Sequence, residues 1–357
     1  MLTQKRILIC PLNWGLGHAT RCIPIINLLL KKNATVIISA EGRALALLQN
    51  EFPDLEYIPL QGVDIRYSTK NFLIFKIIFS IPKIVNSIWR EHRILKKIIE
   101  EKKIDIVISD NRFGLWNKRV KSVFITHQLM IKLPGVEKLL HKINVYFIKK
   151  YDECWIPDIE GSNNLSGDLS HSYPLPNNAF FIGVLSRFQK KETPTITAIT
   201  YDVMAMVSGP EPQRSVFEKL LIKQLQQSKI KALIVCGKTE ISQKKETLNT
   251  IEIVSHLNAD EMQQAILQSN IIISRSGYST IMDLAILGKK AIFIATPGQT
   301  EQKYLAKSLM KKKIAFSQQQ STLDLAIALK EIEKYKGFNG FENEDVLEKR
   351  IEALFYH

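Results

Sequence analysis

The sequence predicts an α/β protein of two domains, each built around a parallel β-sheet. The chain has 357 residues, 45% of them hydrophobic, and single cores rarely exceed roughly 250 residues. Short runs of Val, Ile, Leu and Phe alternate with longer amphipathic stretches. Most of these runs are continuously apolar, which is typical of strands buried on both faces, so we expect helices to cover both faces of each sheet.

Nine apolar runs are expected to be strands, in chain order 6–10, 34–39, 104–109, 122–125, 180–182, 203–207, 232–236, 271–274 and 291–295. The alternation pauses in a polar, proline-containing stretch over 190–200, which reads as a linker or edge loop. We therefore predict an N-terminal domain over 1–178 and a C-terminal domain over 179–340. A last helix over 341–357 can pack on either domain, and the N-terminal domain is our preferred choice.

The cysteine pattern and the apolar runs indicate a cytoplasmic protein. The four cysteines are far apart and show no C-x-x-C spacing, so neither a disulfide framework nor a zinc site is expected. The longest apolar stretch, over 72–81, contains a lysine and is about half the length of a membrane span.

Positive charge is concentrated in one part of the chain. The net charge is +14, and residues 70–150 hold 18 Lys and Arg against six Asp and Glu. We expect one basic amphipathic helix from Ser80, with Pro82 in its first turn, and another over 136–150. Peripheral contact with an anionic membrane is one interpretation, and core-facing helices with solvated lysines are the other. No nucleic-acid-binding signature occurs, so nucleic acid is not an expected partner. A basic nucleotide- or anion-binding protein without activity is the non-enzyme alternative.

Ligands of open parallel sheets bind beyond the carboxyl ends of strands, and the first such loop holds Gly15, Gly17 and His18. The glycines let the backbone turn tightly, and a helix beginning near Ala19 would offer free N–H groups to an anion. Histidines titrate near neutral pH, so His18 suits a general base. A histidine satisfied by a backbone carbonyl is the structural alternative. Asp110 and His127 follow two other strands; each could help deprotonate an acceptor hydroxyl or serve the structure.

Loops of the second half suit a nucleotide. Ser208 and Gly209 precede a helix expected near Arg214, as either a phosphate cradle or an ordinary loop. The segment after the strand over 271–274 offers small and polar residues at a helix start, namely Arg275, Ser276, Gly277, Ser279 and Thr280, followed by Asp283, which could accept both hydroxyls of a ribose. Glu301 and Gln302 open a later helix, where they could cap it or hold sugar hydroxyls.

Several chemistries are absent from the sequence. It contains no G-x-x-x-x-G-K-[ST] loop, no H-E-x-x-H and no G-x-S-x-G elbow. It also lacks a D-x-D pair suited to a metal–diphosphate, so we expect no metal site and no cofactor. A bound diphosphate would be neutralised by helix N-termini and arginines.

The segment from Ser274 to Gly277, then from Asp283 to Ala291, and finally Pro297 with Glu301 and Gln302, resembles the C-terminal domain of glycosyltransferase family 28. The Gly15–His18 loop resembles the N-terminal glycine-rich loop of that family. The resemblance implies a GT-B fold, in which two Rossmann-like domains face a central cleft. It also implies a UDP-sugar in the C-terminal domain and an acceptor, lipid-linked in one member of the family, in the N-terminal domain.

The resemblance assigns further residues. Asp283 matches a glutamate that holds the ribose, and Glu301 and Gln302 match a glutamine pair near the donor sugar. Arg187 matches an arginine near the diphosphate, and Leu257 a position whose backbone reads the uracil. Ser208 and Gly209 match the serine and glycine of a phosphate loop that otherwise departs from the family.

The Gly17–Cys22 stretch also resembles the start of a UDP-sugar hydrolase from nonulosonate biosynthesis, in which the histidine works with water. The present chain is longer in the acceptor domain, which favours transfer. We therefore predict a metal-independent, inverting hexosyltransferase that moves a sugar, an N-acetylhexosamine being one option, from a UDP-sugar to an acceptor that the sequence does not identify, a lipid-linked or cell-envelope molecule being one option. A hydrolase is the alternative.

Overall fold

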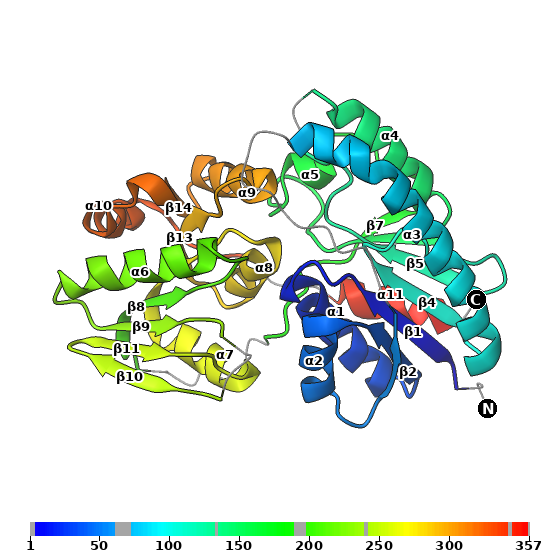
Figure 1. The fold of residues 1–357 in the computed structure, drawn as a ribbon, viewed down its shortest axis with the longest axis horizontal. Coiled ribbons are helices and arrows are strands. Elements are labelled where there is room, and N and C mark those ends of the chain that lie inside the picture. Colours follow the sequence, from blue (N-terminus) through cyan, green and yellow to red (C-terminus); the bar gives the residue numbers. More distant parts are fainter. Residues whose placement is uncertain are drawn as a thin grey trace. The chain divides into compact units, whose positions relative to one another are not determined.

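The computed structural model describes residues 4–60, 73–132, 135–188, 198–238, 242–341 and 345–355. The chain forms two compact units, which are coloured along the sequence in Figure 1. Unit 1 comprises Met1–Ser186 and Asn343–His357, and unit 2 comprises Arg187–Glu342.

Unit 1 is built around a parallel seven-stranded sheet with the strand order β3-β2-β1-β4-β5-β6-β7. Its strands are β1 (Arg6–Pro11), β2 (Thr35–Ala40), β3 (Glu56–Pro59), β4 (Ile106–Asp110), β5 (Lys121–Ile125), β6 (Glu153–Ile156) and β7 (Ala179–Phe181). Its helices are α1 (Leu16–Lys31), α2 (Gly42–Glu51), α3 (Leu73–Lys102), α4 (Glu137–Ile148), α5 (Asp168–His171) and α11 (Val346–Phe355).

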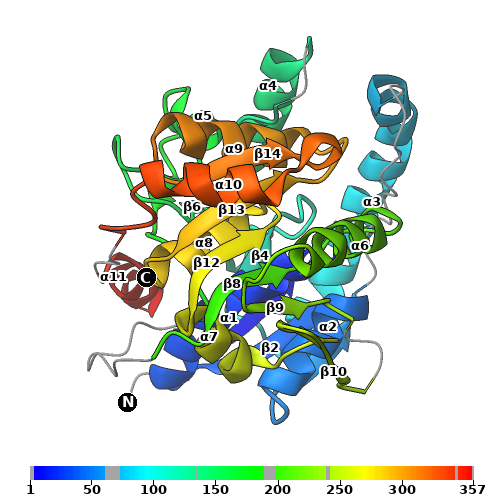
Figure 2. The same cartoon turned by 90° about the vertical axis from the view of Figure 1, so that its left-hand side faces the viewer.

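Unit 2 has a second seven-stranded sheet with the order β10-β11-β9-β8-β12-β13-β14, and Figure 2 shows β13, β12, β8 and β9 in sequence across it. Only the edge strand β10 is antiparallel to its neighbour among the described strands. The strands are β8 (Tyr201–Met206), β9 (Ala232–Val235), β10 (Lys245–Leu248), β11 (Ile251–Val254), β12 (Ser269–Ser274), β13 (Lys290–Ala295) and β14 (Phe316–Gln319). The helices are α6 (Gln213–Gln226), α7 (Ala259–Leu267), α8 (Tyr278–Ile286), α9 (Thr300–Lys311) and α10 (Leu325–Glu331), with 3-10 turns at Gln320–Thr322 and Ile332–Lys334.

Each sheet reverses its winding direction at one point. The first strand of unit 1, β1, lies between β2 and β4, and the first strand of unit 2, β8, lies between β9 and β12. This is the doubly wound, Rossmann-like arrangement, in which ligands bind beyond the carboxyl ends of the two strands at the reversal. The topology therefore marks one candidate site in each unit.

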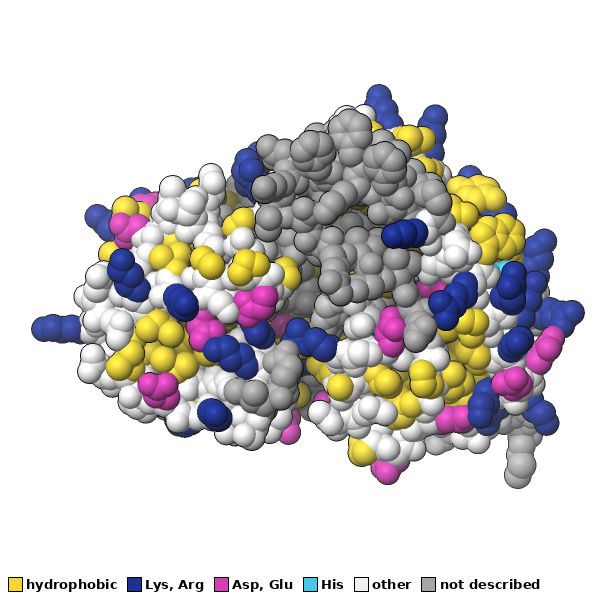
Figure 3. Space-filling model, in the orientation of Figure 1, with side chains coloured by type: hydrophobic (Ala, Val, Ile, Leu, Met, Phe, Trp, Pro, Cys, Tyr) yellow, Lys and Arg dark blue, Asp and Glu magenta, His cyan; other side chains and the backbone are white. Residues whose placement is uncertain are grey.

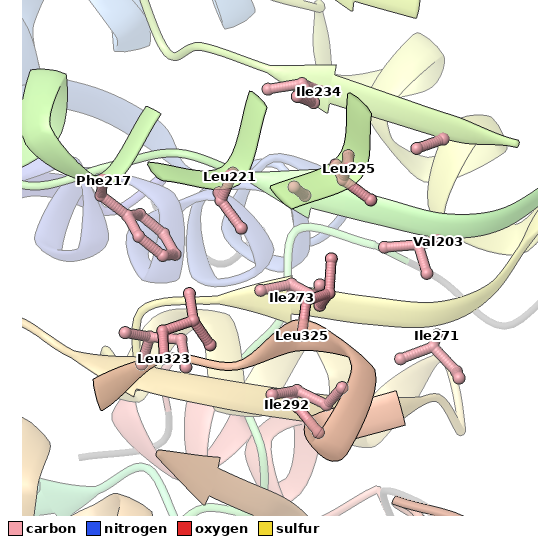
Figure 4. Packing of buried hydrophobic residues seen from close by; sticks show 14 of the residues in the cluster. Val203, Phe217, Leu221, Leu225, Ile234, Ile271, Ile273, Ile292, Leu323 and Leu325 are labelled. Atoms are coloured by element: carbon pink, nitrogen blue, oxygen red, sulfur yellow. The ribbon is translucent and has the colours of Figure 1, made fainter. Parts of the chain in front are cut away.

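The unit 2 core shows why continuous apolar runs form these strands. Phe217, Leu221 and Leu225 recur every four residues along α6 and lie against sheet residues such as Ile273, as Figure 4 shows. All four side chains are fully buried. A helix places residues four apart on one face, so one stripe of α6 covers one face of the sheet.

In unit 1, a buried ion pair joins α3 to the sheet. Arg112 lies just beyond β4, and its Nε and Nη2 donate to Glu91 Oε1 of α3 at 3.1 and 2.9 Å. The same guanidinium donates to the backbone carbonyl of Leu60. Arg112 is therefore a structural residue, although it stands only two residues after the candidate Asp110.

The structure corrects the predicted boundaries. β7 pairs with β6 in the first sheet, so unit 1 extends to Ser186 and beyond the predicted end at residue 178. The run over 203–207 forms a strand that starts two residues earlier, at Tyr201. The linker predicted over 190–200 falls mostly outside the described residues. The last helix spans Val346–Phe355 and belongs to unit 1, where Lys32 of α1 pairs with Glu348 and Glu352.

Five strands were missed, namely β3, β6, β10, β11 and β14. Two helix starts also differ from prediction. α1 begins at Leu16 rather than near Ala19, and α3 begins at Leu73, so Ser80 lies inside the helix and does not cap it. Within the described part of the chain, every helix is too short or too polar to pass through a lipid bilayer.

Candidate functional site

Four polar side chains meet at the reversal point of unit 1. His18 and Arg21 come from the first two turns of α1, Asp110 is the last residue of β4, and His127 lies two residues beyond β5. His18 Nδ1 is 3.1 Å from Asp110 Oδ1, and Arg21 Nε donates to Asp110 Oδ2 at 2.6 Å. Arg21 Nη2 also donates to Asp110 Oδ1. The three predicted catalytic residues are thus brought together around Arg21, which the sequence reading missed.

Local structure explains this convergence. β1 and β4 are neighbours, with Pro11 opposite Asp110, so the loop after β1 and the end of β4 share one edge of the sheet. Gly15 has a φ of +148°, a backbone conformation that favours glycine, and it precedes the first helical residue of α1. His18 and Arg21 are three residues apart in that helix and therefore lie on one face.

Neighbouring positive charge keeps Asp110 ionised in spite of its burial. The residue has no exposed surface, and burial alone would raise the pKa of its carboxyl group. The positive charge of Arg21, together with His18, outweighs burial and lowers the pKa of Asp110 from 3.8 to about 2. A carboxylate with this pKa is ionised near pH 7, so Asp110 can orient His18 and Arg21 through its two oxygens.

In unit 2, three loops end at the same edge of the sheet, after the adjacent strands β8, β12 and β13. The first contains Ser208 and Gly209, which are exposed, and Gly209 has a φ of +108°. The second contains Gly277, the N-cap of α8. In the third, the Thr296 hydroxyl is buried, has no hydrogen-bond partner among the described residues, and lies 3.6 Å from where a Cβ on Gly209 would be. A tight backbone, a helix N-terminus and a hydroxyl therefore meet at this edge.

Arg187 and Asp283, which were assigned to the diphosphate and the ribose, lie near each other. Arg187 Nε is 4.0 Å from Asp283 Oδ2, and both side chains are largely buried. The Arg187 Nε atom has no hydrogen bond within the described residues, and its guanidinium lies over the Phe188 ring. The pair can hold adjoining parts of one anionic, hydroxyl-bearing ligand.

The guanidinium of Arg275 does not fit a phosphate contact. Arg275 is 2% exposed and donates to the backbone carbonyls of Ile294 and Gln213 and to Gln320 Oε1. It also lies over the Phe217 ring, 4.1 Å from its centroid. Burial lowers the pKa of Arg275 to about 10. The side chain therefore joins α6, β13 and the turn after β14 inside the unit.

Ser276 and Gln302 connect two of the loops. Ser276 Oγ donates to the Gln302 carbonyl at 2.8 Å, and the Thr296 N–H donates to Gln302 Oε1 at the same distance. The hydroxyl of Ser276 is thus used within the protein. The remaining predicted residues are half-buried: Ser279 and Thr280 in the first turn of α8, Glu301 in that of α9, Leu257 just before α7, and Gly17 in α1.

Comparisons with known proteins agree with this topology. Residues 213–346 match the glycosyltransferase family 28 C-terminal domain, and residues 5–127 match glycosyl transferase family 1. The chain is 23% identical over 351 residues to the UDP-N-acetylglucosamine–N-acetylmuramyl-(pentapeptide) pyrophosphoryl-undecaprenol N-acetylglucosamine transferase of Histophilus somni (strain 129Pt), covering 94% of this chain and 92% of that protein.

Two solved structures show the same fold. Acinetobacter baumannii MurG has a TM-score of 0.59 and 13% identity, covering 99% of this chain and 100% of that one. The glycosyltransferase SnogD from Streptomyces nogalater has a TM-score of 0.61 and 12% identity, with the same coverage. These likenesses establish the architecture predicted from the sequence, a GT-B fold with two Rossmann-like sheets.

Proposed function

We propose that this chain, a family 28-like glycosyltransferase with the GT-B fold, transfers a hexosyl group from a UDP-sugar to an acceptor hydroxyl, with inversion and without a metal ion or other cofactor. The observation that carries the proposal is the contact of His18 with an ionised, buried Asp110. A histidine oriented by a carboxylate is suited to remove a proton from a hydroxyl. The matched family models and the curated relative are transferases, which favours transfer over hydrolysis.

The proposed reaction is a single displacement. His18 takes the acceptor proton, and the acceptor oxygen attacks the anomeric carbon as the bond from that carbon to the diphosphate oxygen breaks. The electron pair leaves with UDP, so the configuration inverts. Arg187, the Ser208–Gly209 loop and the N-terminus of α8 would stabilise the diphosphate as its charge grows, because these groups supply positive charge and N–H donors in place of a metal.

The remaining donor contacts that we propose are those that the family resemblance implies. Asp283 would accept the ribose hydroxyls, the Leu257 backbone would read the base, and Glu301 and Gln302 would contact the transferred sugar. Half-buried Ser279 and Thr280, in the first turn of α8, would lie beside the phosphates. In unit 1, Gly15 and Gly17 would let the backbone approach the sugar near His18.

A lipid-linked acceptor at the cytoplasmic face of a membrane is the acceptor class that we propose. The curated relative acts on an undecaprenol-linked substrate. Unit 1 carries exposed apolar side chains on α3 and α4, and Figure 3 shows Lys and Arg side chains gathered over α3 with hydrophobic ones beside them. Apolar area together with cations is the combination that binds an anionic membrane surface.

Nucleotide binding tests the proposal. Calorimetry and thermal shift with UDP, GDP, dTDP, CMP and several UDP-sugars, without added metal, should show selective binding of UDP and one UDP-sugar. Asp283→Ala should weaken UDP binding by about tenfold or more, because a hydrogen bond to a charged group contributes roughly 1.5–3 kcal/mol. Glu246→Ala, an exposed acidic residue on β10, is the control and should bind UDP as the wild type does. If the protein binds none of these nucleotides, the assignment of a UDP-sugar as donor is overturned.

A further inference from the structure

Two histidines face one guanidinium through the same ring nitrogen. Arg21 Nη1 is 3.0 Å from His127 Nδ1, and Arg21 Nη2 is 2.8 Å from His18 Nδ1. An arginine side chain only donates hydrogen bonds, and it keeps its charge at every pH that a protein experiences. Each Nδ1 must therefore present a lone pair whenever its contact with Arg21 is made.

This requirement fixes the protonation of His127. A neutral imidazole that accepts at Nδ1 carries its proton on Nε2. A second proton would have to sit on Nδ1 and point at the guanidinium, so like charges would meet in a nearly dry setting, since His127 is 5% exposed. Ser170 Oγ donates to the His127 carbonyl at 2.6 Å and holds the backbone in place. The Gln128 amide, 3.5 Å from Nε2, can accept from it by turning its oxygen toward the ring.

His18 differs because its Nδ1 has two neighbours that require opposite protonation states. Arg21 requires a lone pair on Nδ1, and Asp110 requires a proton there. Nδ1 accepts from Arg21 Nη2 in one tautomer, and it donates to Asp110 Oδ1, 3.1 Å away, in the other. Only the second tautomer leaves Nε2 free to take a proton. The other titratable groups near Asp110 are the thiols of Cys22, whose Sγ is 3.9 Å from Oδ2, and Cys10; burial raises the pKa of both, so neither adds charge.

We propose that Arg21 is a positioning residue that gives the two histidines different roles. It locks His127 as a neutral imidazole that carries its proton on Nε2 and never acts as a base. His18, which Asp110 can pull into the other tautomer, is the histidine that accepts the proton. The assignment of the base rests on the proposed function, whereas the locked state of His127 depends only on the Arg21 contact.

Nitrogen NMR tests the lock without substrate. In the wild-type chain labelled with ¹⁵N-histidine, long-range ¹H–¹⁵N spectra should show His127 protonated on Nε2 alone from about pH 5 to 8, where an ordinary histidine titrates. Among the signals of the seven histidines, that of His127 is identified by its loss in His127→Gln and that of His18 by its loss in His18→Gln. A His127 that carries its proton on Nδ1, or that becomes an imidazolium in this range, would overturn the proposal.

Arg21 variants test its cause. Arg21→Lys keeps a positive charge beside Asp110. Its single ammonium lacks the rigid fork of donors of a guanidinium, so it cannot contact the rings of His18 and His127 together. Arg21→Lys should let His127 titrate, and so should the neutral double variant Arg21→Met/Asp110→Asn. If His127 stays locked on Nε2 in either folded variant, Arg21 is not the determinant. Should both variants fail to fold, the wild-type spectrum still decides whether His127 is locked.

Kinetics separate the two roles. His127→Gln removes the locked imidazole but leaves the proposed base in place, so the acidic limb of the pH profile should remain. His18→Gln should cost at least about a hundredfold in rate and abolish that limb. Loss of the limb in His127→Gln would show that His127 is the base and sink the division of roles. Absence of glycosyl transfer in the wild type would count against the proposed function alone, because the tautomer is measured independently.

Discussion

Asp110 is a fully buried carboxylate whose pKa falls from 3.8 to about 2 because Arg21 and His18 outweigh the effect of burial. A depressed pKa contributes stability above the unfolded-state pKa, and this contribution is lost as the pH falls through the folded-state value. Between about pH 4 and 2 the wild type should therefore lose about 2 kcal/mol of unfolding free energy through this group. Urea denaturation of wild type and Asp110→Asn at several pH values measures it. Parallel curves for the two proteins would contradict the ionised state of Asp110.

His18 is the side chain on which the proposed chemistry depends. His18→Ala should lower kcat by at least about a hundredfold, because a positioned general base contributes that much or more, while UDP binding stays unchanged. The measurement is turnover of the UDP-sugar that binds best. Lys31→Ala, at the other end of α1, is the control. Unchanged turnover in His18→Ala would refute its role.

Sequence reasoning at this scale succeeds where a residue's position in the fold determines its surroundings. The ends of strands pointed to His18, Asp110 and His127, because the carboxyl ends of parallel strands meet at one edge. Arg21 lies within the Gly17–Cys22 stretch but was missed, since no pattern indicates that a helical arginine is 3% exposed and faces inward. Its spacing of three residues from His18 was the available signal. The burial of Arg275 was likewise not indicated by any pattern. Arginines are seldom buried, so the sequence favoured a phosphate contact over a structural role for this side chain.

At the scale of elements, α3 is docked where Gly114 approaches it. A Cβ on Gly114 would lie 2.4 Å from the Ile88 carbonyl oxygen and 2.8 Å from Glu91 Cβ. Both atoms belong to the helix that Arg112 holds, so α3 would have to shift. Gly114→Ala should therefore cost about 2 kcal/mol or more in unfolding free energy, as overpacking does. Urea denaturation checks this.

A second glycine serves as the matched control. Among the residues that the structure describes, a Cβ on Gly277 would meet only Thr280 Oγ1, at 4.0 Å, and Gly277 also has an ordinary φ. Gly277→Ala should cost less than about 1 kcal/mol, because no clash arises and the remaining loss is that of alanine replacing a preferred N-cap residue. Equal stability of the two variants would show that α3 can shift to accommodate a methyl group at residue 114 without loss of stability.

The strands that were predicted differ from those that were missed in their sequence pattern. Strands with long β-branched runs, such as β1, β2 and β12, were predicted because burial on both faces leaves an unbroken apolar stretch. Exposed or short strands carry no such run: β10 reads Lys-Glu-Thr-Leu, and β14 reads Phe-Ser-Gln-Gln. Their pairing comes from neighbouring strands, which a local pattern cannot reveal. The start of α3 was misplaced because Ser80 and Pro82 imitate a helix start.

At the scale of the molecule, α4 carries an apolar stripe of Leu139, Ile143 and Tyr146, each 43–59% exposed and spaced along one helix face. Lys150 Nζ lies 4.7 Å from the Tyr146 ring centroid and 5.7 Å from that of Trp116, which packs against His92 of α3. Lys150 and Trp116 thus link α4 to α3, on which Trp89 is 66% exposed.

Vesicle flotation tests this surface. Replacing the three α4 stripe residues with serine should reduce recovery on anionic vesicles about tenfold or more, because both apolar burial and charge contribute to binding. Wild-type binding should fall with added salt. The control is Val216→Ser/Ile327→Ser, which removes exposed apolar residues from unit 2. Equal recovery of wild type on neutral and anionic vesicles at low salt would contradict a charge-assisted membrane contact.

α11 is part of unit 1 although it follows unit 2 in the chain. Ile351 and Leu354 are buried, Lys32 pairs with Glu348, and the Arg350 guanidinium lies 3.4 Å from the Phe180 ring centroid. Removing residues 343–357 should therefore destabilise unit 1 by about 3 kcal/mol or more, since each buried aliphatic side chain contributes roughly 1.5–3 kcal/mol. UDP binding by unit 2 should persist at low temperature. Calorimetric unfolding that is unchanged by the truncation would contradict this.

This return of the chain has a consequence for biosynthesis. The first 186 residues leave the ribosome long before α11 is synthesised. Unit 1 therefore stays incomplete while all of unit 2 is made. Unit 2 is continuous and can fold as soon as it emerges. The nascent protein would thus acquire its donor half first, and its proposed base, His18, would stand on a finished scaffold only when the last helix docks beside α1.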